Sequence, residues 1–399
     1  MYRLIGLLFF NFIVLNIQAQ EAESIKNTDA ITYDLYSKNE WKQLIEFSKR
    51  AINRKEDFFY LRMRIGIAYY ELKEYRNALV HFEKASQMEG QNELLKEYLY
   101  YCYLFTEQFP QALKLSEEFS KETLSTTKME NPSGIFYSNV EYGNKLSSDT
   151  SMYKSLSYFQ VGLGFRLGKS LTAYAAISNL SQQMYYGTIS QQQLYVSLTI
   201  PLKHSWLLMP AFHYLNYTYS NLLVPPATIT NPKANNLDGT GSVYSFSASK
   251  NWKDFLFTGT ASYSTLNNAK QYQQQVSVNW YPLHNNRLSF NGSLLLFSND
   301  SGTTAKVIPS FGGKYFLNSK VSLAGYFTSF DVKNYNELNG QVANNSDDIT
   351  HIRYTGLAEW NCYKNISVFG VYSHESKTEK VSEKTYTYTT VIGGIKIIF

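Results

Sequence analysis

Val391-Ile-Gly-Gly-Ile-Lys-Ile-Ile-Phe399 is the stretch of sequence that decides the fold. In an extended strand, successive side chains point to opposite faces, so Val391, Ile395 and Phe399 share one face and Lys396 lies on the other. The free edge of such an apolar strand would invite aggregation in a soluble domain. A transmembrane β-barrel has no free edge, so we expect this strand to close a barrel. A C-terminal core strand of a soluble β domain is the alternative.

Residues 1–19 have the features of a secretory signal peptide. Arg3 supplies a positive charge, residues 4–17 are largely apolar, and Ala19 is a small residue suited to cleavage. An uncleaved anchor is the alternative. No other apolar run approaches the ~20 residues that a transmembrane helix needs, so we expect an exported chain without such a helix.

Composition excludes several classes of function. The chain has 399 residues, a net charge of +5, two cysteines, and as many as 34 tyrosines and 25 phenylalanines. Cys102 and Cys362 lie far apart, and the six histidines show no ligand spacing, so we expect no disulfide framework, metal or cofactor. Lys and Arg are not clustered, which argues against nucleic-acid binding. The many aromatic residues favour numerous short, half-polar strands.

The density of charged residues divides the chain into two domains. Residues 20–128 are rich in Asp, Glu, Lys and Arg, as exposed helical surfaces are, whereas residues 129–399 carry few charges for their length. The change falls within the polar segment 120–134, which contains Pro132 and is typical of a linker.

The first domain contains a repeat with a period of 34 residues. Equivalent positions in the three copies are Trp41, Tyr75 and Phe109; Leu44, Ala78 and Ala112; Ala51, Ala85 and Phe119; Ile31, Ile65 and Leu99; and Leu35, Tyr69 and Tyr103. The middle copy, with Ile65-Gly66, Tyr69, Ala78, Phe82 and Ala85, resembles the tetratricopeptide repeat. The outer copies depart from it, with Thr32 and Tyr100 in place of the glycine and Ser48 and Ser116 in place of Phe82.

The resemblance implies an all-α solenoid that binds a periplasmic protein or an extended polymer. Most of the repeat residues are expected to be core. Tyr69, Tyr75 and Tyr103 are the candidates for a partner surface.

The second domain alternates apolar and polar residues with period 2, which predicts an antiparallel transmembrane β-barrel. Fourteen strands are expected at residues 133–143, 154–167, 170–181, 188–202, 205–220, 240–250, 254–265, 270–283, 286–299, 303–316, 319–331, 349–363, 365–377 and 384–399. Short turns alternate with mostly longer loops, the longest at 221–239 and 332–348. The short turns are expected on the periplasmic side. Loop 221–239 is expected either to fold inward as a constriction or to cover the rim. A soluble sandwich is the alternative fold.

Five charged residues are expected to line the barrel lumen: Arg166, Lys314, Arg353, Glu359 and Lys396. An excess of bases would favour anionic or neutral polar solutes. In the alternative, these charges pair with one another and stiffen the wall. Tyr158, Tyr195, Tyr281 and Tyr326 are also candidates to face inward, either to stack on sugar rings or simply to fill space and mark the membrane interface.

A signal peptide, tetratricopeptide-like repeats and a C-terminal barrel together resemble the YaiO-like outer-membrane proteins and, on a smaller scale, the repeat-plus-barrel exporters of exopolysaccharide. The resemblance implies an outer-membrane barrel in contact with lipid, repeats in the periplasm, and a role in export or assembly of a surface polysaccharide or other polar polymer. With only three repeats, an assembly anchor that docks a periplasmic or secretion partner is the alternative.

An enzyme is not expected. The chain has no Gly-x-Ser-x-Gly elbow, although His204, His213 and His284 lie among many serines and leave an outer-membrane hydrolase as a remote alternative.

Overall fold

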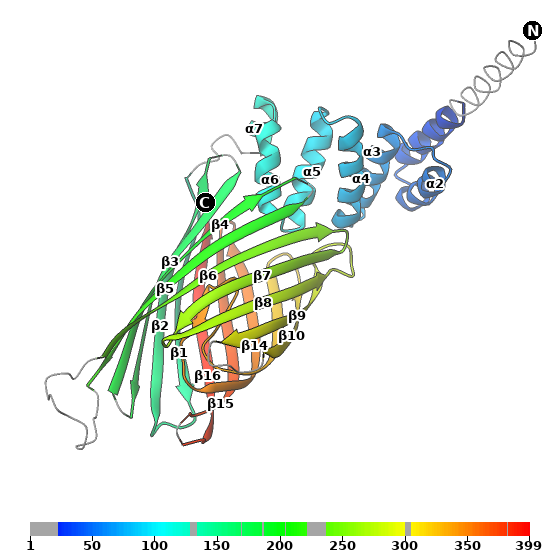
Figure 1. The fold of residues 1–399 in the computed structure, drawn as a ribbon. Helices are drawn as coiled ribbons and strands as arrows, with labels where there is room; N and C mark the ends of the chain where they lie inside the picture. The colour runs from blue at the N-terminus through cyan, green and yellow to red at the C-terminus, as the bar shows by residue number, and fades with distance from the viewer. Residues whose placement is uncertain are drawn as a thin grey trace, which may run out of the picture. The chain divides into compact units, whose positions relative to one another are not determined.

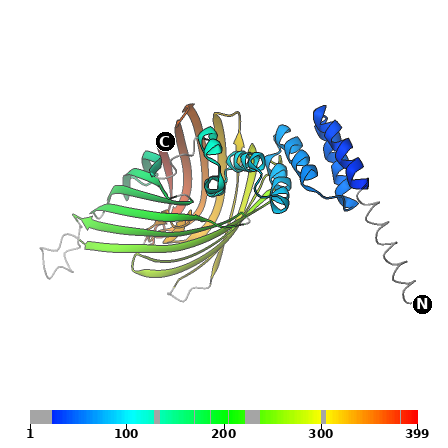
Figure 2. The same cartoon turned by 90° about the horizontal axis from the view of Figure 1, so that it is seen from above.

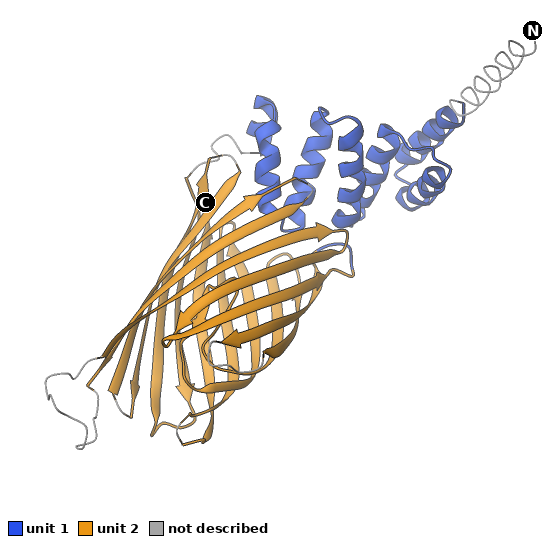
Figure 3. Ribbon diagram, in the orientation of Figure 1, with its two compact units in different colours: residues 1–129, 283–285 blue, residues 130–282, 286–399 orange. Residues whose placement is uncertain are grey.

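The computed structural model describes residues 23–127, 134–168, 170–185, 187–203, 205–221, 237–299, 305–380 and 382–399. The expected signal peptide, His204 and almost all of loop 221–239 therefore lie outside the described residues. The chain forms two compact units: residues 1–129 with 283–285, and residues 130–282 with 286–399 (Figure 3).

The first unit is helical, as predicted. Its helices comprise residues 23–37, α2 (Trp41–Asn53), α3 (Phe59–Glu71), α4 (Tyr75–Met88), α5 (Glu93–Phe105), α6 (Phe109–Leu115), the 3₁₀ turn η1 (Ser116–Glu118) and α7 (Lys121–Thr127) (Figure 1). None of the helices in the described residues is both long and apolar enough to cross a membrane.

The helices repeat with the period seen in the sequence. The helices α2, α4 and α6 start at Trp41, Tyr75 and Phe109, which are 34 residues apart (75 − 41 and 109 − 75). The starts of α3 and α5, Phe59 and Glu93, differ by the same step (93 − 59). The period therefore belongs to the fold as well as to the residue pattern.

The turns between paired helices are also equivalent. Asn39, Lys73 and Glu107, again one period apart, all have positive φ, at 58°, 60° and 59°. After each of them, the next backbone N–H donates to the carbonyl five residues earlier, as in Glu74 to Tyr69. This is the hydrogen bond of a Schellman motif, which usually places glycine at the positive-φ position.

Close packing of α3 on α4 depends on Gly66. A Cβ atom at Gly66 would lie 2.4 Å from Cε1 of Phe82, a distance that real contacts do not reach. Phe82 is fully buried, with Ala78 and Ala85 beside it on α4. The small residues of the repeat thus let the two helices approach around one aromatic ring.

The second unit is a closed antiparallel barrel of fourteen strands, which confirms the predicted architecture and strand number (Figures 1 and 2). The wall strands are β1 (Gly134–Ser147), β2 (Tyr153–Leu167), β3 (Leu171–Met184), β4 (Gly187–Pro201), β5 (Trp206–Ser220), β6 (Leu237–Trp252), β7 (Phe255–Leu266), β8 (Ala269–Trp280), β9 (Leu288–Asn299), β10 (Lys306–Phe316), β11 (Val321–Val332), β14 (Ile349–Tyr363), β15 (Ile366–Thr378) and β16 (Thr385–Ile398).

The barrel closes between β1 and β16, as expected from the terminal strand. The two strands pair antiparallel, with Val140 opposite Ile395 and Tyr142 opposite Gly393. The backbone N–H of Phe399 donates to the carbonyl oxygen of Phe136 at 2.9 Å. No wall strand is left with an unpaired edge.

The outward face of the barrel is apolar between two aromatic rows. On three strands, a tryptophan and a tyrosine on this face stand eight residues apart (214 − 206, 252 − 244 and 280 − 272): Trp206 and Tyr214 on β5, Tyr244 and Trp252 on β6, and Tyr272 and Trp280 on β8. Eight residues of strand span ~26 Å, and strand tilt makes the height smaller. The spacing suits an apolar band of about 25 Å with interfacial girdles.

The two rims of the barrel differ in the length of the connections between strands. The short-turn rim carries residues 168–170, 202–205, 253–254, 281–287, 317–320 and 364–365. The long-loop rim carries the described connections 148–152, 267–268 and 333–348, and β5, which ends at Ser220, and β6, which begins at Leu237, also meet this rim. The predicted alternation in length holds only in part, because 267–268 is a tight turn. The two longest connections nevertheless share one rim.

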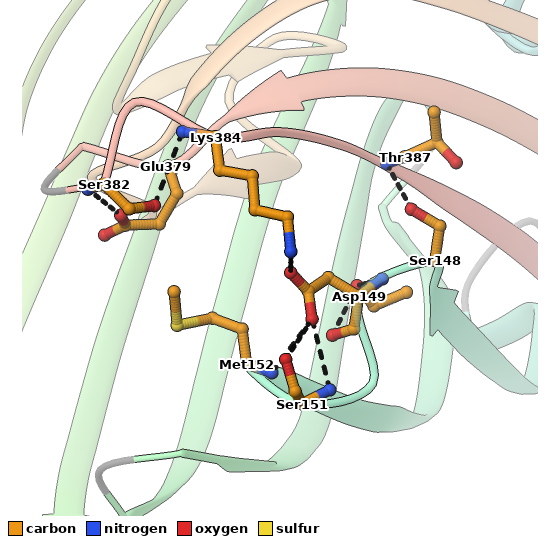
Figure 4. A network of polar contacts seen from close by, with 9 residues as sticks. Ser148, Asp149, Ser151, Met152, Glu379, Ser382, Lys384 and Thr387 are labelled. Atoms are coloured by element: carbon orange, nitrogen blue, oxygen red, sulfur yellow. Dashed lines mark hydrogen bonds and ion pairs between the residues drawn. The ribbon is translucent and has the colours of Figure 1, made fainter.

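Two connections of the long-loop rim are tied together across the closure (Figure 4). The ammonium group of Lys384 lies 2.6 Å from the carboxylate of Asp149, and the backbone N–H of Thr387 donates to the hydroxyl of Ser148 at 2.9 Å. Hydrogen bonds from Lys384 and Ser151 lower the pKa of the Asp149 carboxyl to about 2. These polar contacts stabilise the rim where β1 meets β16.

Candidate functional site

The connection 333–348 folds back into the barrel as a hairpin. Its strands are β12 (Tyr335–Glu337) and β13 (Val342–Asn344), paired antiparallel around the turn 338–341. Leu338, Asn339 and Gly340 have positive φ at 50°, 55° and 80°. The hairpin contacts inward-facing residues of strands around the whole barrel, from β2 to β16, so it lies in the lumen. We call residues 333–348 the lumen hairpin.

Apolar contacts hold the two strands of the lumen hairpin to opposite parts of the wall. Tyr335 is 1 % exposed, and its ring centroid lies 4.6 Å from that of Phe330 on β11. The cluster around it is formed by Leu295, Phe297, Ile308, Phe330 and Val332. Ala343 on β13 packs against a second cluster of Leu215, Val243 and Leu266. Burial on both sides fixes the hairpin across the lumen.

Gln273 on β8 binds the hairpin backbone as a neighbouring strand would. Its amide Nε2 donates to the carbonyl oxygen of Asn336 at 2.8 Å, and its Oε1 accepts from the backbone N–H of Asn336 at 2.9 Å. Oε1 also accepts from the Asn336 side chain at 3.0 Å. Gln273 is buried. Its loss would leave buried backbone groups without partners.

The hairpin tip is held from β4, β5 and β6. The carbonyl oxygen of Gly340 lies 2.8 Å from Nδ1 of His213, which is 1 % exposed. Oδ1 of Asn339 accepts from the hydroxyls of Ser245 and Ser247 at 2.7 and 2.8 Å. Because a carbonyl only accepts, Nδ1 of His213 carries the proton in this contact.

The hairpin base is held by charged groups. Tyr153 donates to the carboxylate of Asp348 at 2.7 Å, and Tyr386 donates to the same oxygen. The guanidinium of Arg353 on β14 binds both carboxylate oxygens of Glu337, at 2.5 and 2.6 Å. Both contacts come from Nη2 of Arg353, and hydrogen bonds between charged groups are stronger than those between neutral groups.

Little space remains between the hairpin and the wall of β7 and β8. The cavity there has a volume of about 10 Å³, enough for about one water molecule. It is lined by Thr260, Ser262, Gln273, Gln275, Leu295, Asn336, Glu337 and Asn339. The hairpin therefore lies close to this part of the wall.

The structure brings together two of the five charged residues predicted for the lumen. Lys396 lies 3.0 Å from Glu359 and 4.8 Å above the ring of Phe369. Arg353 pairs with Glu337, a hairpin residue that sequence reasoning did not single out. Arg166 lies 5.4 Å from the ring of Phe136, and Lys314 lies 4.5 Å above that of Phe316. The alternative in which these charges pair with one another thus describes Glu359 and Lys396, whereas the partner of Arg353 lies in the hairpin.

Four tyrosines were candidates to face inward. Tyr158, Tyr195 and Tyr326 do so: Tyr195 reaches the carbonyl oxygen of Asn339 at 3.4 Å, Tyr326 shares its strand face with Phe330, and Tyr158 shares its strand face with Gln160. Tyr158 donates to Gln160 at 2.9 Å. Tyr281 lies in a connection at the short-turn rim, outside the strands.

The repeat tyrosines occupy different environments. Tyr69 is only 6 % exposed and stacks on His81 with a centroid distance of 5.5 Å, so it is core. Tyr75 packs against Phe105 at 4.6 Å, and Tyr103 donates to Glu83 at 3.1 Å. Tyr75 and Tyr103 are half-buried, which leaves them as the surface candidates of the three.

The part of the chain that the structure describes contains no cluster of three or more His, Cys, Asp or Glu able to hold a metal ion. His213 is a catalytic candidate from the sequence. Its two ring nitrogens form hydrogen bonds with the carbonyl oxygen of Gly340 and with Oε1 of Gln193. No serine hydroxyl is among those partners. The residues that define the site are the lumen hairpin and the wall residues that bind it.

The hairpin was missed in the sequence, although a signal was present. Asn339-Gly340 is a dipeptide that strongly favours the turn of a β-hairpin. It lies between two short segments that contain residues typical of strands. Loop 332–348 was noted only for its length.

Similarity to known proteins is limited to structure. No protein-family model matches the chain, and no curated protein matches it. Similar solved structures include the Pseudomonas putida toluene transporter TodX, 8 % identical with a TM-score of 0.44 over 69 % of this chain and 92 % of that one. Omp33 of Acinetobacter baumannii is 10 % identical, with a TM-score of 0.38 over 66 % of this chain and 99 % of that one. An anion-selective porin of Comamonas acidovorans is 10 % identical, with a TM-score of 0.33 over 67 % of this chain and 100 % of that one. The closed barrel itself is established by the strand pairing of this chain.

Proposed function

We propose that the chain is an outer-membrane barrel that passes a polar polymer, such as a surface polysaccharide, and that the lumen hairpin closes the passage. The observation that carries the proposal is the hairpin itself, because it fills the lumen of a barrel whose outer face suits lipid. A closed barrel with an apolar band needs no other anchor in a membrane.

The inner surface supports a polar cargo. Inward-facing positions along β4 and along β6 to β9 are mostly hydroxyl and amide side chains, many of them bonded across strands, such as Ser249 to Thr258 and Asn291 to Asn279. Fourteen strands enclose more space than the eight whose side chains fill a barrel. A polar lining of this kind suits a hydrated chain.

The helical unit would act on the periplasmic side. An even number of strands brings both ends of the barrel to the short-turn rim, and the short turns of such barrels are periplasmic. We propose that the 34-residue helix pairs are tetratricopeptide-like and bind a periplasmic protein or the polymer itself. Tyr75 and Tyr103 would contribute to that surface.

The second candidate is an assembly anchor that conducts nothing. The extent of the hairpin contacts favours it, since polar groups, an ion pair and two apolar clusters all hold the lumen closed. In that case the barrel would only fix the helical unit at the membrane.

Conductance across planar bilayers separates the two candidates. Val332 and Thr350 are paired, so a linker of two to four residues can replace 334–348 without moving the wall strands. We expect small or no current from the intact chain and a stable pore from the hairpin-deleted chain. If the hairpin-deleted barrel is folded but does not conduct, passage is excluded and the anchor remains.

A further inference from the structure

Two tyrosines on the wall face the part of the lumen between the hairpin tip and the short-turn rim. Tyr326 on β11 shares its strand face with Phe330, the residue that packs on the hairpin. Tyr174 on β3 donates its hydroxyl hydrogen to Oδ1 of Asn139 at 3.0 Å. Tyr326 is 39 % exposed despite facing inward, so solvent reaches it inside the barrel.

Each ring lies over a glycine of the neighbouring strand. A Cβ atom at Gly312 would be 2.1 Å from Cδ1 of Tyr326, and one at Gly162 would be 2.1 Å from the hydroxyl oxygen of Tyr174. The glycines make room for the rings to lie along the wall. A ring that lies along the wall can meet a solute with its face rather than with its edge.

The ring of Tyr174 belongs to a row that leads to the hairpin. Its centroid lies 6.1 Å from that of Tyr137 and 6.2 Å from that of Tyr195. Tyr195 in turn reaches the carbonyl oxygen of Asn339 at the hairpin tip. The aromatic row therefore borders the place where the passage is closed.

The surrounding lumen is polar and holds charges of both signs. Glu141 on β1 accepts a hydrogen bond from Asn139, the residue to which Tyr174 donates, and Arg166 on β2 and Lys314 on β10 also face inward. Hydroxyl and amide side chains share this depth of the barrel: Ser197, Thr199, Ser249, Thr258, Ser277, Asn279, Ser289, Asn291 and Asn361. Lys396 is neutralised by Glu359 at 3.0 Å. A paired charge attracts an anionic ligand only weakly. A hydrocarbon ligand would form no hydrogen bonds with the polar side chains of the wall.

We propose that Tyr174 and Tyr326 are stacking subsites for neutral sugar rings. A pyranose ring has an apolar C–H face, which suits the negatively polarised face of an aromatic ring, and a rim of hydroxyls for the polar rows. This deepens the proposed function, on which it rests, because it names uncharged glycan as the cargo class. Tyr326 is exposed with the hairpin in place, so this subsite can be filled while the passage is closed.

The test is binding of maltohexaose to the full chain in detergent, measured by titration calorimetry. We expect Tyr174→Leu and Tyr326→Leu each to weaken binding roughly two- to tenfold, the equivalent of one aromatic contact. Leucine keeps apolar bulk over the glycine but removes the ring face. Tyr326→Phe should keep most of the affinity. The matched control is Tyr372→Leu, a tyrosine on the outward face of β15.

A polyethylene glycol of similar length and an oligogalacturonate serve as ligand controls. Absence of maltohexaose binding, equal losses from Tyr372→Leu, or tighter binding of the charged oligosaccharide would overturn the inference. A gel-shift assay for the heat-stable barrel confirms that each variant is folded. Ring-dependent binding without conductance of the hairpin-deleted chain would leave the subsites standing while removing the proposed passage.

Discussion

Nδ1 of His213 on β5 lies 2.8 Å from the carbonyl oxygen of Gly340 at the tip of the lumen hairpin. The two residues are far apart in sequence, and both are buried inside the barrel. Because the contact is buried, its loss leaves a carbonyl group without a partner.

His213→Ala should loosen the hairpin tip. The unpaired Gly340 carbonyl costs about 1–3 kcal/mol, which raises the population of the open lumen roughly 5- to 150-fold. Single-channel recording in planar bilayers should show more frequent openings. The control His374→Ala removes a histidine bonded to Thr389 within the wall and should leave the openings unchanged. Equal behaviour of the two variants would separate the hairpin from gating.

Gly66→Ala should destabilise the helical unit. Since the added Cβ would lie 2.4 Å from Phe82, the helices must separate, at a cost of about 1–3 kcal/mol. Hydrogen-exchange protection of α3 and α4 in the full chain measures the loss. Adding Phe82→Leu to Gly66→Ala should recover part of it, and a double variant no better than Gly66→Ala would show that another contact is responsible.

Lys73→Gly should stabilise the same unit. Lys73 holds φ at 60°, a conformation that costs a non-glycine residue about 1 kcal/mol. In contrast, Lys84→Gly, at an exposed position inside α4, should destabilise by about 1 kcal/mol. Hydrogen exchange should therefore show a gain in stability for Lys73→Gly and a loss of stability for Lys84→Gly. Destabilisation by both would contradict the turn assignment.

Acid should weaken the helical unit through His81. Burial and the nearby positive charges of Arg62 and Lys49 lower its pKa to about 3, from 6.5 in an unfolded chain. Asp57 opposes the shift. The unfolded state therefore binds the proton first, and the stability present above pH 6.5 is lost as the pH falls towards 3.

The loss should reach about 2 kcal/mol between pH 7 and pH 5. Exchange protection of α3 and α4 measured across this range tests it, and His81→Gln should flatten the dependence. A slope that persists in His81→Gln would place the titrating group elsewhere.

The wall strands could be predicted because their information is local. Alternation such as that of Phe159 to Leu167 on β2 is visible in any window of a few residues, and the structure keeps those residues outward. The 34-residue period was visible for the same reason. Boundaries moved by a few residues, as on β10, which begins at Lys306.

The lumen hairpin could not be placed from sequence in the same way. Its side chains are those of an ordinary polar loop, and its inward position depends on partners such as Gln273 and His213, which lie on strands distant in sequence. The Asn339-Gly340 turn predicts a hairpin but not the side of the wall on which it lies. Likewise, Glu337, which pairs with Arg353, could not be predicted as its partner because the two residues meet only when the hairpin folds inward.

The pairing of Val140 with Ile395 has a consequence for assembly. Each wall strand from β2 to β15 pairs with the wall strands that are next to it along the chain, but β1 and β16 pair with each other across the whole length of the barrel sequence. Until they do, the unfinished sheet exposes two edges able to pair with other chains. Chaperones must therefore stay bound to the unfinished barrel until β16 has been synthesised. A chain that lacks β16 should aggregate instead of entering the membrane.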